Sequence, residues 1–327
     1  MQETCEVGLT GVGKRDDAGD CDGWWAVHIF FATDGSVSAR FAQAQILALP
    51  WRSPPQITVM MATNDPHPAF RSLIPTARRA FDAAPVNVLQ ISLPTATEVV
   101  DKARLAMEEK GAAVATRIHE GPPAPTIVEM ARACRADLVA VGSRGLGAYK
   151  GFLLGSVSQY VAHHAHCSVL LAKTPPKGER RFLLAIGDSV HAEAVLRWLK
   201  ELDLSSGAWI HQVVVVRSSE DLLCLDSVDR HGIGKTMTPA WLTSCGNPSN
   251  MPEIASGQGP DTQAVRVTAS VRCGQEVPEI MATIRDFRPE LLVVGAGARR
   301  SPDGSLLGTV AQKLIHQAPC SVLIVRP

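Results

Sequence analysis

The chain lacks an excess of charge and a long apolar run. Its 327 residues contain 32 Lys and Arg against 32 Asp and Glu. This balance gives no reason to expect nucleic acid or an acidic membrane as a partner. No apolar stretch reaches the roughly 20 residues that span a bilayer, and the N-terminal segment MQETCEVGLTGVGKRDDAGD has no signal-peptide core. We therefore expect a cytoplasmic protein that binds neither nucleic acid nor membrane.

The eight cysteines form no Cys-x-x-Cys pair. Several lie within apolar runs, which is typical of reduced thiols in a core rather than of disulfides or metal ligands. His163, His164, His166 and Cys167 look like a ligand set. Only two of these four types recur in the second half of the chain, where a Gln and a Pro replace the others. A helix end beside a strand is the favoured interpretation, and we predict no metal site.

One pattern occurs twice, 153 positions apart. Gly142 in VGSRGLG corresponds to Gly295 in VGAGARR, and the CSV of residues 167–169 corresponds to that of residues 320–322. A constant shift at separated positions indicates a duplication, and the unit is far longer than a solenoid repeat. We expect an N-terminal extension and two domains of ordinary size. Their predicted bounds are 1–25, 26–174 and 179–327.

Apolar periodicity gives both domains the same order of strands and helices. The expected strands are 27–32, 57–62, 114–118, 138–142 and 168–172, then 182–186, 213–216, 267–271, 291–295 and 321–325. Helices are expected at 37–49, after the capping box Thr95-x-x-Glu98, at 127–134, at 156–165, and in the matching places of the second copy. This alternation predicts a parallel sheet covered on both faces. The segments 64–94 and 217–263 do not fit it, and we interpret them as long, mobile excursions.

The glycine spacing after the fourth expected strand is the most specific feature. In VGSRGLGAYKGFLLGSVS, nine residues separate Gly145 from Gly155-Ser156. Small residues let a ligand approach the backbone. Gly155-Ser156 begins a helix whose free N–H groups and positive dipole end suit a phosphate. The spacing therefore predicts a phosphate-binding loop.

These residues resemble the universal stress protein family in its tandem, two-domain form. The family's nucleotide motif is Gly-x2-Gly-x9-Gly-[Ser/Thr], and the ATDGS segment (32–36) and the closing CSVLLAK strand occur in the family's order. The resemblance covers residues 26–327. It implies an α/β fold of two Rossmann-like, adenine nucleotide alpha hydrolase-like domains, each a five-stranded parallel sheet with helices on both faces. The implied ligand is ATP or another adenine nucleotide. Whether Mg²⁺ binds with it stays open.

The resemblance also implies a set of binding residues in domain 1. The adenine side would be Ala32, Thr33 and Met61, the nucleoside end Asp34, the floor under ribose and phosphates Val141, Gly142 and Gly145, and the phosphate site Gly155, Ser156, Val157 and Ser158. Arg144 lies inside the loop. It either offsets phosphate charge or is a solvated cation, and both interpretations stay open.

The second copy departs from the pattern. Ala298 replaces the middle glycine, Gly187-Asp188 inverts the Asp-Gly order, and Ala311 stands where the first copy has Ser158. Losing two charge-assisted hydrogen bonds, each worth roughly 1.5–3 kcal/mol, lowers affinity about 100-fold or more. We therefore expect domain 1 to bind the nucleotide and domain 2 to be weak or structural. A residual site there would use Gly187, Val294, Gly295, Gly308, Thr309 and Val310.

Three function classes stay open. The leading hypothesis is a regulatory stress-response protein that binds ATP, AMP or a cyclic nucleotide. The alternatives are a slow ATP hydrolase or phosphoryl transferase, for which we name no catalytic residue, and a non-binding scaffold. Leu170-Leu171 and Leu323-Ile324 are apolar edges that we expect to pair inside the chain. A homodimer of chains and an unidentified protein partner are further options.

Overall fold

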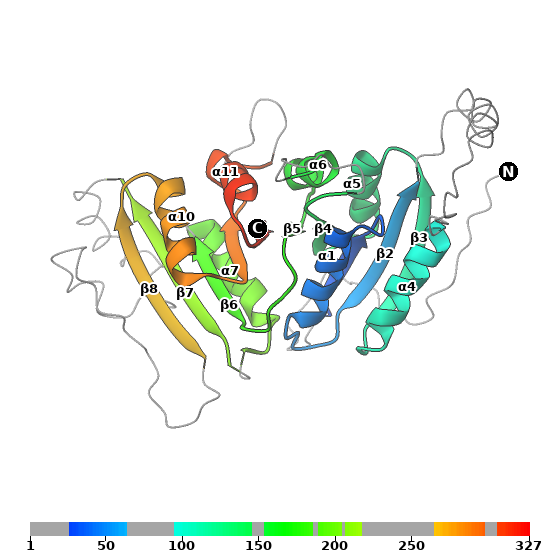
Figure 1. Ribbon diagram of the computed structural model, residues 1–327, viewed down its shortest axis with the longest axis horizontal. Coiled ribbons are helices and arrows are strands. Elements are labelled where there is room, and N and C mark those ends of the chain that lie inside the picture. The colour runs from blue at the N-terminus through cyan, green and yellow to red at the C-terminus, as the bar shows by residue number, and fades with distance from the viewer. Residues whose placement is uncertain are drawn as a thin grey trace, which may run out of the picture.

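A computed structural model describes residues 26–63, 95–145, 154–185, 189–204, 207–217, 265–297 and 306–327. Figure 1 shows one long twisted sheet with helices in front of it and behind it. The predicted excursions, 64–94 and 217–263, lie outside the described residues except for residue 217.

The elements follow the predicted order in both halves. Domain 1 comprises β1 (His28–Ala32), α1 (Val37–Ala48), β2 (Gln56–Thr63), α4 (Ala96–Glu108), β3 (Ala113–Glu120), α5 (Pro123–Ala133), β4 (Leu138–Gly142), α6 (Ser156–His164) and β5 (Ser168–Ala172). Domain 2 comprises β6 (Arg181–Ala185), α7 (Ser189–Lys200), β7 (Trp209–Val216), β8 (Arg266–Cys273), α10 (Glu276–Phe287), β9 (Leu291–Gly295), α11 (Thr309–Gln317) and β10 (Ser321–Val325).

The ten strands form one sheet in the order β3-β2-β1-β4-β5-β10-β9-β6-β7-β8. All neighbours are parallel except β5 and β10, which run antiparallel. Each half is thus a five-stranded parallel sheet, which confirms the predicted fold. Within domain 1 the chain moves outward from β1 to β3 and then returns to β4 on the other side of β1. That reversal opens a crevice at the carboxyl ends of β1 and β4, where ligands of such sheets bind.

Two apolar layers hold the helices on the sheet. One layer joins α5, α6, α10 and α11 to one face, with Ile127, Val161, Ile284 and Leu314 among its buried side chains. The other joins α1, α4 and α7 to the opposite face, with Ile46, Met107 and Val195 buried. A central parallel sheet buried on both faces needs continuous apolar strands, and β4 (LVAVG) and β5 (SVLLA) have that composition.

The two last strands join the halves. Leu170 pairs with Leu323, and Val169 with Ile324, in an antiparallel ladder. Leu170 and Val169 are fully buried. This is the intrachain pairing that the apolar edges predict. Because β5 and β10 occupy each other's free edges, the remaining edges of the sheet are β3 and β8.

On the α1 and α7 side, a second set of contacts crosses the same boundary. The rings of Trp51 and Trp198 lie 5.7 Å apart, and Trp198 Nε1 donates to Ser168 Oγ at 3.1 Å. The N–H of Arg52 donates to the carbonyl of Glu201 at 2.8 Å. The boundary between the halves is therefore packed on this side of the sheet as well as along the strands.

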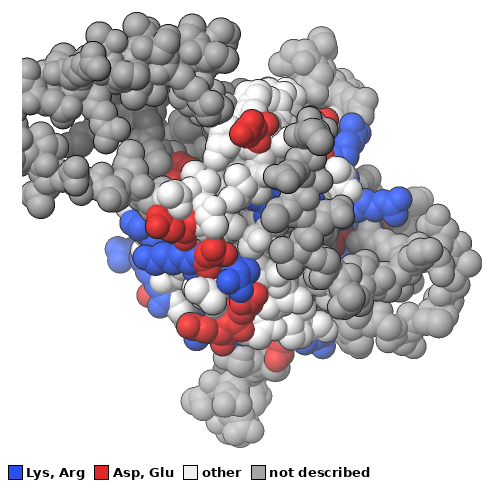
Figure 2. Space-filling view, turned by 90° about the vertical axis from the view of Figure 1, so that its right-hand side faces the viewer, with Lys and Arg blue, Asp and Glu red and all other residues white. Residues whose placement is uncertain are grey.

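The outer face beside β3 and α4 carries both signs of charge. Figure 2 shows Lys and Arg side chains mixed with Asp and Glu over its described part. On α4, Arg104 lies 2.8 Å from Glu108 and 3.5 Å from Asp101. Surface pairs of this kind contribute little to stability. Among the described helices, none is long and apolar enough to cross a membrane.

Candidate functional site

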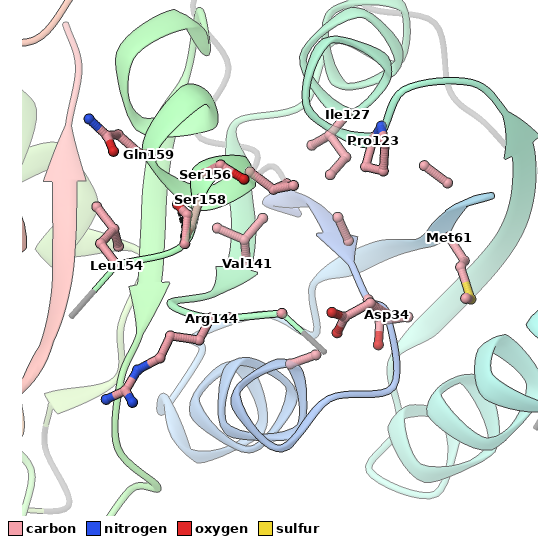
Figure 3. Close-up of a pocket in the computed structure, with 18 residues that line it drawn as sticks. Asp34, Met61, Pro123, Ile127, Val141, Arg144, Leu154, Ser156, Ser158 and Gln159 are labelled. Carbon is pink, nitrogen blue, oxygen red and sulfur yellow. Dashed lines mark hydrogen bonds between the residues drawn. The ribbon is translucent and has the colours of Figure 1, made fainter. Parts of the chain in front are cut away.

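A cavity of about 720 Å³ opens at the crevice between β1 and β4. All twelve residues predicted for domain 1 line it (Figure 3). They come from the ends of β1, β2 and β4, from the loop after β4, and from the start of α6. The volume lies within the roughly 300–1,000 Å³ of small-molecule sites.

Six further residues line the cavity and were not predicted: Ala39, Ala62, Pro123, Ile127, Leu154 and Gln159. Gln159 could have been found, because it lies one helical turn after Ser156 on the same face of α6. Pro123 and Ile127 come from α5, and the sequence alone does not show that the start of α5 faces the loop after β4. Their apolar side chains line the cavity together with those of Met61 and Val141 (Figure 3).

Asp34 lines the cavity and lies two residues after the end of β1. Its Oδ1 accepts a hydrogen bond of 2.9 Å from the N–H of Ser36, the residue that caps α1. A Cβ on Gly145 would lie only 2.8 Å from Asp34 Oδ2. The glycine therefore lets the loop after β4 come close to this carboxylate. The segments that follow β1 and β4 thus meet at Asp34.

Gly142 has a packing role at the end of β4. A Cβ there would lie 2.5 Å from the N of Ala39 and from the carbonyl carbon of Ser38. The first turn of α1 thus rests directly on the backbone of Gly142. The Ser36 hydroxyl donates to the carbonyl of Arg144 at 3.2 Å, and the Ser38 hydroxyl donates to the same carbonyl. These contacts fix the start of the loop after β4 to α1.

The hydroxyl of Ser158 is engaged inside the protein. It donates to the carbonyl of Ser143 at 2.8 Å and lies 3.0 Å from the carbonyl of Gly155. The N–H of Gly155 donates to the same Ser143 carbonyl at 2.7 Å. Because a hydroxyl has one proton to donate, this arrangement assigns Ser158 to closing the loop. The family resemblance implied instead that this hydroxyl faces a phosphate.

The start of α6 forms the polar wall. Gly155 is the N-cap and has no side chain to satisfy the first N–H groups of the helix. Ser156 follows as an exposed first residue. A helix start of this kind directs backbone donors and a partial positive charge outward. The wall can therefore receive an anionic group without a lysine or arginine.

Arg144 lines the cavity, but its side chain extends away from Asp34 (Figure 3). It is exposed. Asp34 and Arg144 are the two charged side chains among the described residues that line the cavity. The described residues contain no group of three or more His, Cys, Asp or Glu placed to hold a metal ion.

The corresponding region of domain 2 is built differently. Val294 and Gly295 end β9, Gly308 caps α11, and Thr309 and Val310 begin that helix. Gly187 lies outside the described residues, as does Ala298. The N–H of Gly308 donates to the carbonyl of Ala296 at 2.6 Å, which repeats the loop closure by Gly155.

The loop that follows β9 nevertheless has another backbone conformation. Gly297 has φ +97° where domain 1 has Arg144, which is not among the residues with positive φ. A Cβ on Gly297 would lie 2.9 Å from the Cα of Gly308, so the two backbones touch. Ala311 provides no hydroxyl to match Ser158 and is buried.

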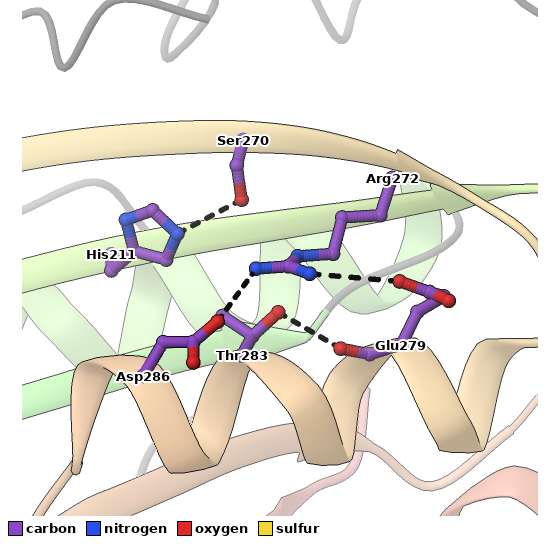
Figure 4. Close-up of polar contacts among 6 residues, drawn as sticks. All are labelled: His211, Ser270, Arg272, Glu279, Thr283 and Asp286. Atoms are coloured by element: carbon purple, nitrogen blue, oxygen red, sulfur yellow. Dashed lines mark hydrogen bonds and ion pairs between the residues drawn. The ribbon is translucent and has the colours of Figure 1, made fainter. Parts of the chain in front are cut away.

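A polar cluster outside the cavity, which no sequence pattern indicated, joins α10 to β8 at the edge of domain 2 (Figure 4). Arg272 on β8 lies 3.1 Å from Asp286 and 3.6 Å from Glu279, both on α10. His211 on β7 contacts the hydroxyls of Thr268 and Ser270 at 2.7 and 2.9 Å. The polar groups of this cluster thus contact one another between β7 and β8 and between β8 and α10.

Comparison with known proteins gives a consistent result. The profile of the universal stress protein family matches residues 28–173 and 253–326. A universal stress protein of Methanocaldococcus jannaschii is 41% identical over 80 residues, which are 24% of this chain and 47% of that protein. The chain thus spans about half of that relative. A universal stress protein of Mycobacterium tuberculosis is 23% identical over 304 residues, 84% of this chain and 97% of the relative.

A solved universal stress protein from Archaeoglobus fulgidus has the same fold over the length of both halves. Its TM-score is 0.57 at 17% identity, with 91% of this chain and 98% of that chain covered. The family profile does not include residues 174–252. The structure nevertheless places β6, α7 and β7 there in the order of β1, α1 and β2, so the second copy of the fold is complete in its described strands.

Proposed function

Because the chain belongs to the universal stress protein family, we propose that domain 1 binds one adenine nucleotide, with ATP as the leading candidate, and that the protein is a nucleotide-dependent regulator. One observation carries the proposal: five separate segments converge on a single cavity, which is lined by apolar side chains such as Met61 and Ile127 and by the start of α6. The apolar side chains suit a purine, and the helix start suits a phosphate.

The residues divide the ligand between them. Met61 and Ile127 would contact the base, and the carboxylate of Asp34 would accept a hydrogen bond from a ribose hydroxyl. Backbone N–H groups at Ser156 and Val157, with the Ser156 hydroxyl, would hold phosphate oxygens. Since Ser158 closes the loop, it would support this wall without contacting the ligand. Mg²⁺, where present, would be held mainly by the phosphates, because it usually keeps several waters and few protein ligands.

Domain 2 would have a structural role and would bind no nucleotide. Its loop after β9 differs in backbone conformation, and Ala311 in α11 stands where domain 1 has Ser158. We therefore propose a single nucleotide per chain. The boundaries 26–174 and 179–327 and the cytoplasmic location stay predictions.

The structure offers a matched pair of variants to test the proposal. Ser156 and Thr309 are both exposed first residues of their helices, at equivalent positions in the two domains. An aspartate at a helix start is well tolerated in the folded protein, but at Ser156 it would face the phosphates. We expect Ser156→Asp to weaken ATP binding at least about 10-fold, and Thr309→Asp to leave it unchanged, by calorimetric titration.

Equal loss of affinity in both variants would argue against a domain 1 site. Unchanged affinity in Ser156→Asp would exclude the start of α6 as the phosphate site. Parallel measurement of ATP hydrolysis separates a regulator from a slow hydrolase, because binding without turnover favours the regulator.

A further inference from the structure

Lys173 and Arg326 occupy equivalent positions, each directly after the last strand of its domain. Both side chains cross the boundary between the domains and donate to backbone carbonyls at the end of a helix. Lys173 Nζ donates to the carbonyl of Ala318, the C-cap of α11, at 2.6 Å. Arg326 donates to the carbonyl of Ala162, in the last turn of α6, at 2.7 Å, and to that of Cys167 at 2.9 Å.

These contacts satisfy carbonyls that the helices leave unpaired. The last four C=O groups of a helix have no partner within it. In α6, the N–H of Ala165 donates a hydrogen bond to the carbonyl of Val161. The guanidinium of Arg326 donates to the carbonyl of Ala162, and the N–H of Leu306 donates to that of His163 at 2.9 Å. Domain 2 therefore supplies the donors for two consecutive carbonyls of a domain 1 helix.

A cation at this end of a helix also interacts favourably with the negative end of the helix dipole. Burial lowers the pKa of Arg326 only to about 10, so its guanidinium is charged at neutral pH. The backbone N–H of Arg326 adds a bond of 3.2 Å to Ser168 Oγ in β5. Arg326 is thus joined to both α6 and the strand that follows it.

The opposite end of α6 forms the polar wall of the domain 1 cavity. The helix has nine residues and is therefore only about 13 Å long. A short helix moves as one rigid unit, so fixing its last turn also fixes the direction of its first N–H groups. Binding groups work best when their neighbours hold them in place.

We propose that Arg326, the penultimate residue of the chain, positions α6 and so makes nucleotide binding in domain 1 depend on domain 2. The inference rests on the proposed function. It gives the second domain a role that needs no ligand of its own: its C-terminal end holds the phosphate-binding helix of the first. The coupling is reciprocal, because nucleotide bound in domain 1 must stabilise the pairing of the domains by the same amount.

The test compares Arg326→Met with Lys173→Met. Each removes one cation from one side of the same boundary and keeps a long apolar side chain. We expect Arg326→Met to weaken ATP binding by about 5-fold or more. Lys173→Met removes the contact with α11 and is expected to change binding by less than about 2-fold. Arg326→Lys keeps a charge and can still reach a carbonyl, so it should recover part of the affinity.

Hydrogen exchange supplies a readout that does not depend on the nucleotide. In the full chain without ligand, Arg326→Met should speed the exchange of amides in α6 more than of those in α11, and Lys173→Met should do the reverse. Comparable exchange in all other described elements shows that both variants are folded. If Arg326→Met loses protection throughout the protein, Arg326→Lys is compared with the parent instead. In that variant we expect a smaller increase in the exchange rate, confined to the amides of α6.

The two failures are distinguishable. If the parent protein binds no ATP, the proposed function is wrong, and the exchange pattern alone then decides whether Arg326 positions α6. If the parent binds ATP and Arg326→Met binds it equally well, the inference is overturned while the proposed function stands. Equal exchange of α6 in Arg326→Met and the parent also overturns it.

Discussion

The hydroxyl of Ser158 donates a hydrogen bond of 2.8 Å to the carbonyl of Ser143. Ser143 directly follows β4, and Ser158 lies in the first turn of α6. The N–H of Gly155 donates to the same carbonyl at 2.7 Å. The loop is therefore closed at its base by two bonds to one oxygen, and Ser158 is only 3% exposed.

This arrangement predicts a stability effect for Ser158→Ala. Ser143 keeps one hydrogen bond, from Gly155, so its carbonyl is not left unsatisfied. We expect the free energy of unfolding to fall by about 1 kcal/mol, the usual net value of one hydrogen bond. Urea unfolding of the full chain measures it, with Ser156→Ala as the exposed control. A larger loss in Ser156→Ala than in Ser158→Ala would contradict the assignment of Ser158 to loop closure.

Gly142→Ala is expected to destabilise domain 1 strongly. The added Cβ would lie 2.5 Å from backbone atoms of α1, which cannot rotate away as a side chain can. Overpacking of this kind lowers the free energy of unfolding by about 3 kcal/mol. In Gly155→Ser the new Cβ meets its nearest neighbour at 3.4 Å, and serine is a good N-cap, so stability should change little. Thermal unfolding of both variants tests the contrast. Equal stability would show that α1 can move away from β4.

The pH dependence of stability reports on Lys173. Burial lowers the pKa of its ammonium to about 8 from a usual 10.5, with the charge of Arg144 acting in the same direction and the thiol of Cys320 acting against it. Between these two pKa values the unfolded chain binds more protons than the folded chain. Stability therefore rises with pH in this window.

The rise expected from Lys173 is about 1 kcal/mol between pH 7 and pH 9. Above that range the buried thiols of Cys167 and Cys320 act in the opposite direction, because burial raises their pKa to about 12 and 11. The parent is therefore compared with Lys173→Met at each pH by urea unfolding. The variant should lack the rise, and parallel curves for the two proteins would show that Lys173 titrates alike in both states.

The central strands could be predicted to the residue because they are buried on both faces. β4, β5, β9 and β10 are short, mostly apolar runs, and each begins and ends where the sequence indicates. β7 was predicted only from residue 213, whereas it begins at Trp209. Its first half carries His211 and Gln212, whose polar side chains conceal the strand pattern near the edge of the sheet.

The sequence predicted that the site residues lie together, but it did not predict every contact that they make. In a parallel sheet the carboxyl ends of neighbouring strands meet at one edge, so residues after β1, β2 and β4 had to converge. The packing of Gly142 under α1 depends on how closely the helix approaches the strand, which the sequence does not encode in any local pattern. The contact of Arg326 with α6 depends on the antiparallel register of β5 and β10. It joins residues 164 positions apart, and no spacing predicts it.

The most direct test of the account is the amount and identity of nucleotide held by the purified full chain. The protein is stripped of ligand, saturated with ATP, freed of excess and denatured, and the released nucleotide is identified and counted by mass spectrometry. One adenine nucleotide per chain, lost in Ser156→Asp and kept in Thr309→Asp, is the predicted result. Two nucleotides per chain, or none, would contradict a single working site in domain 1.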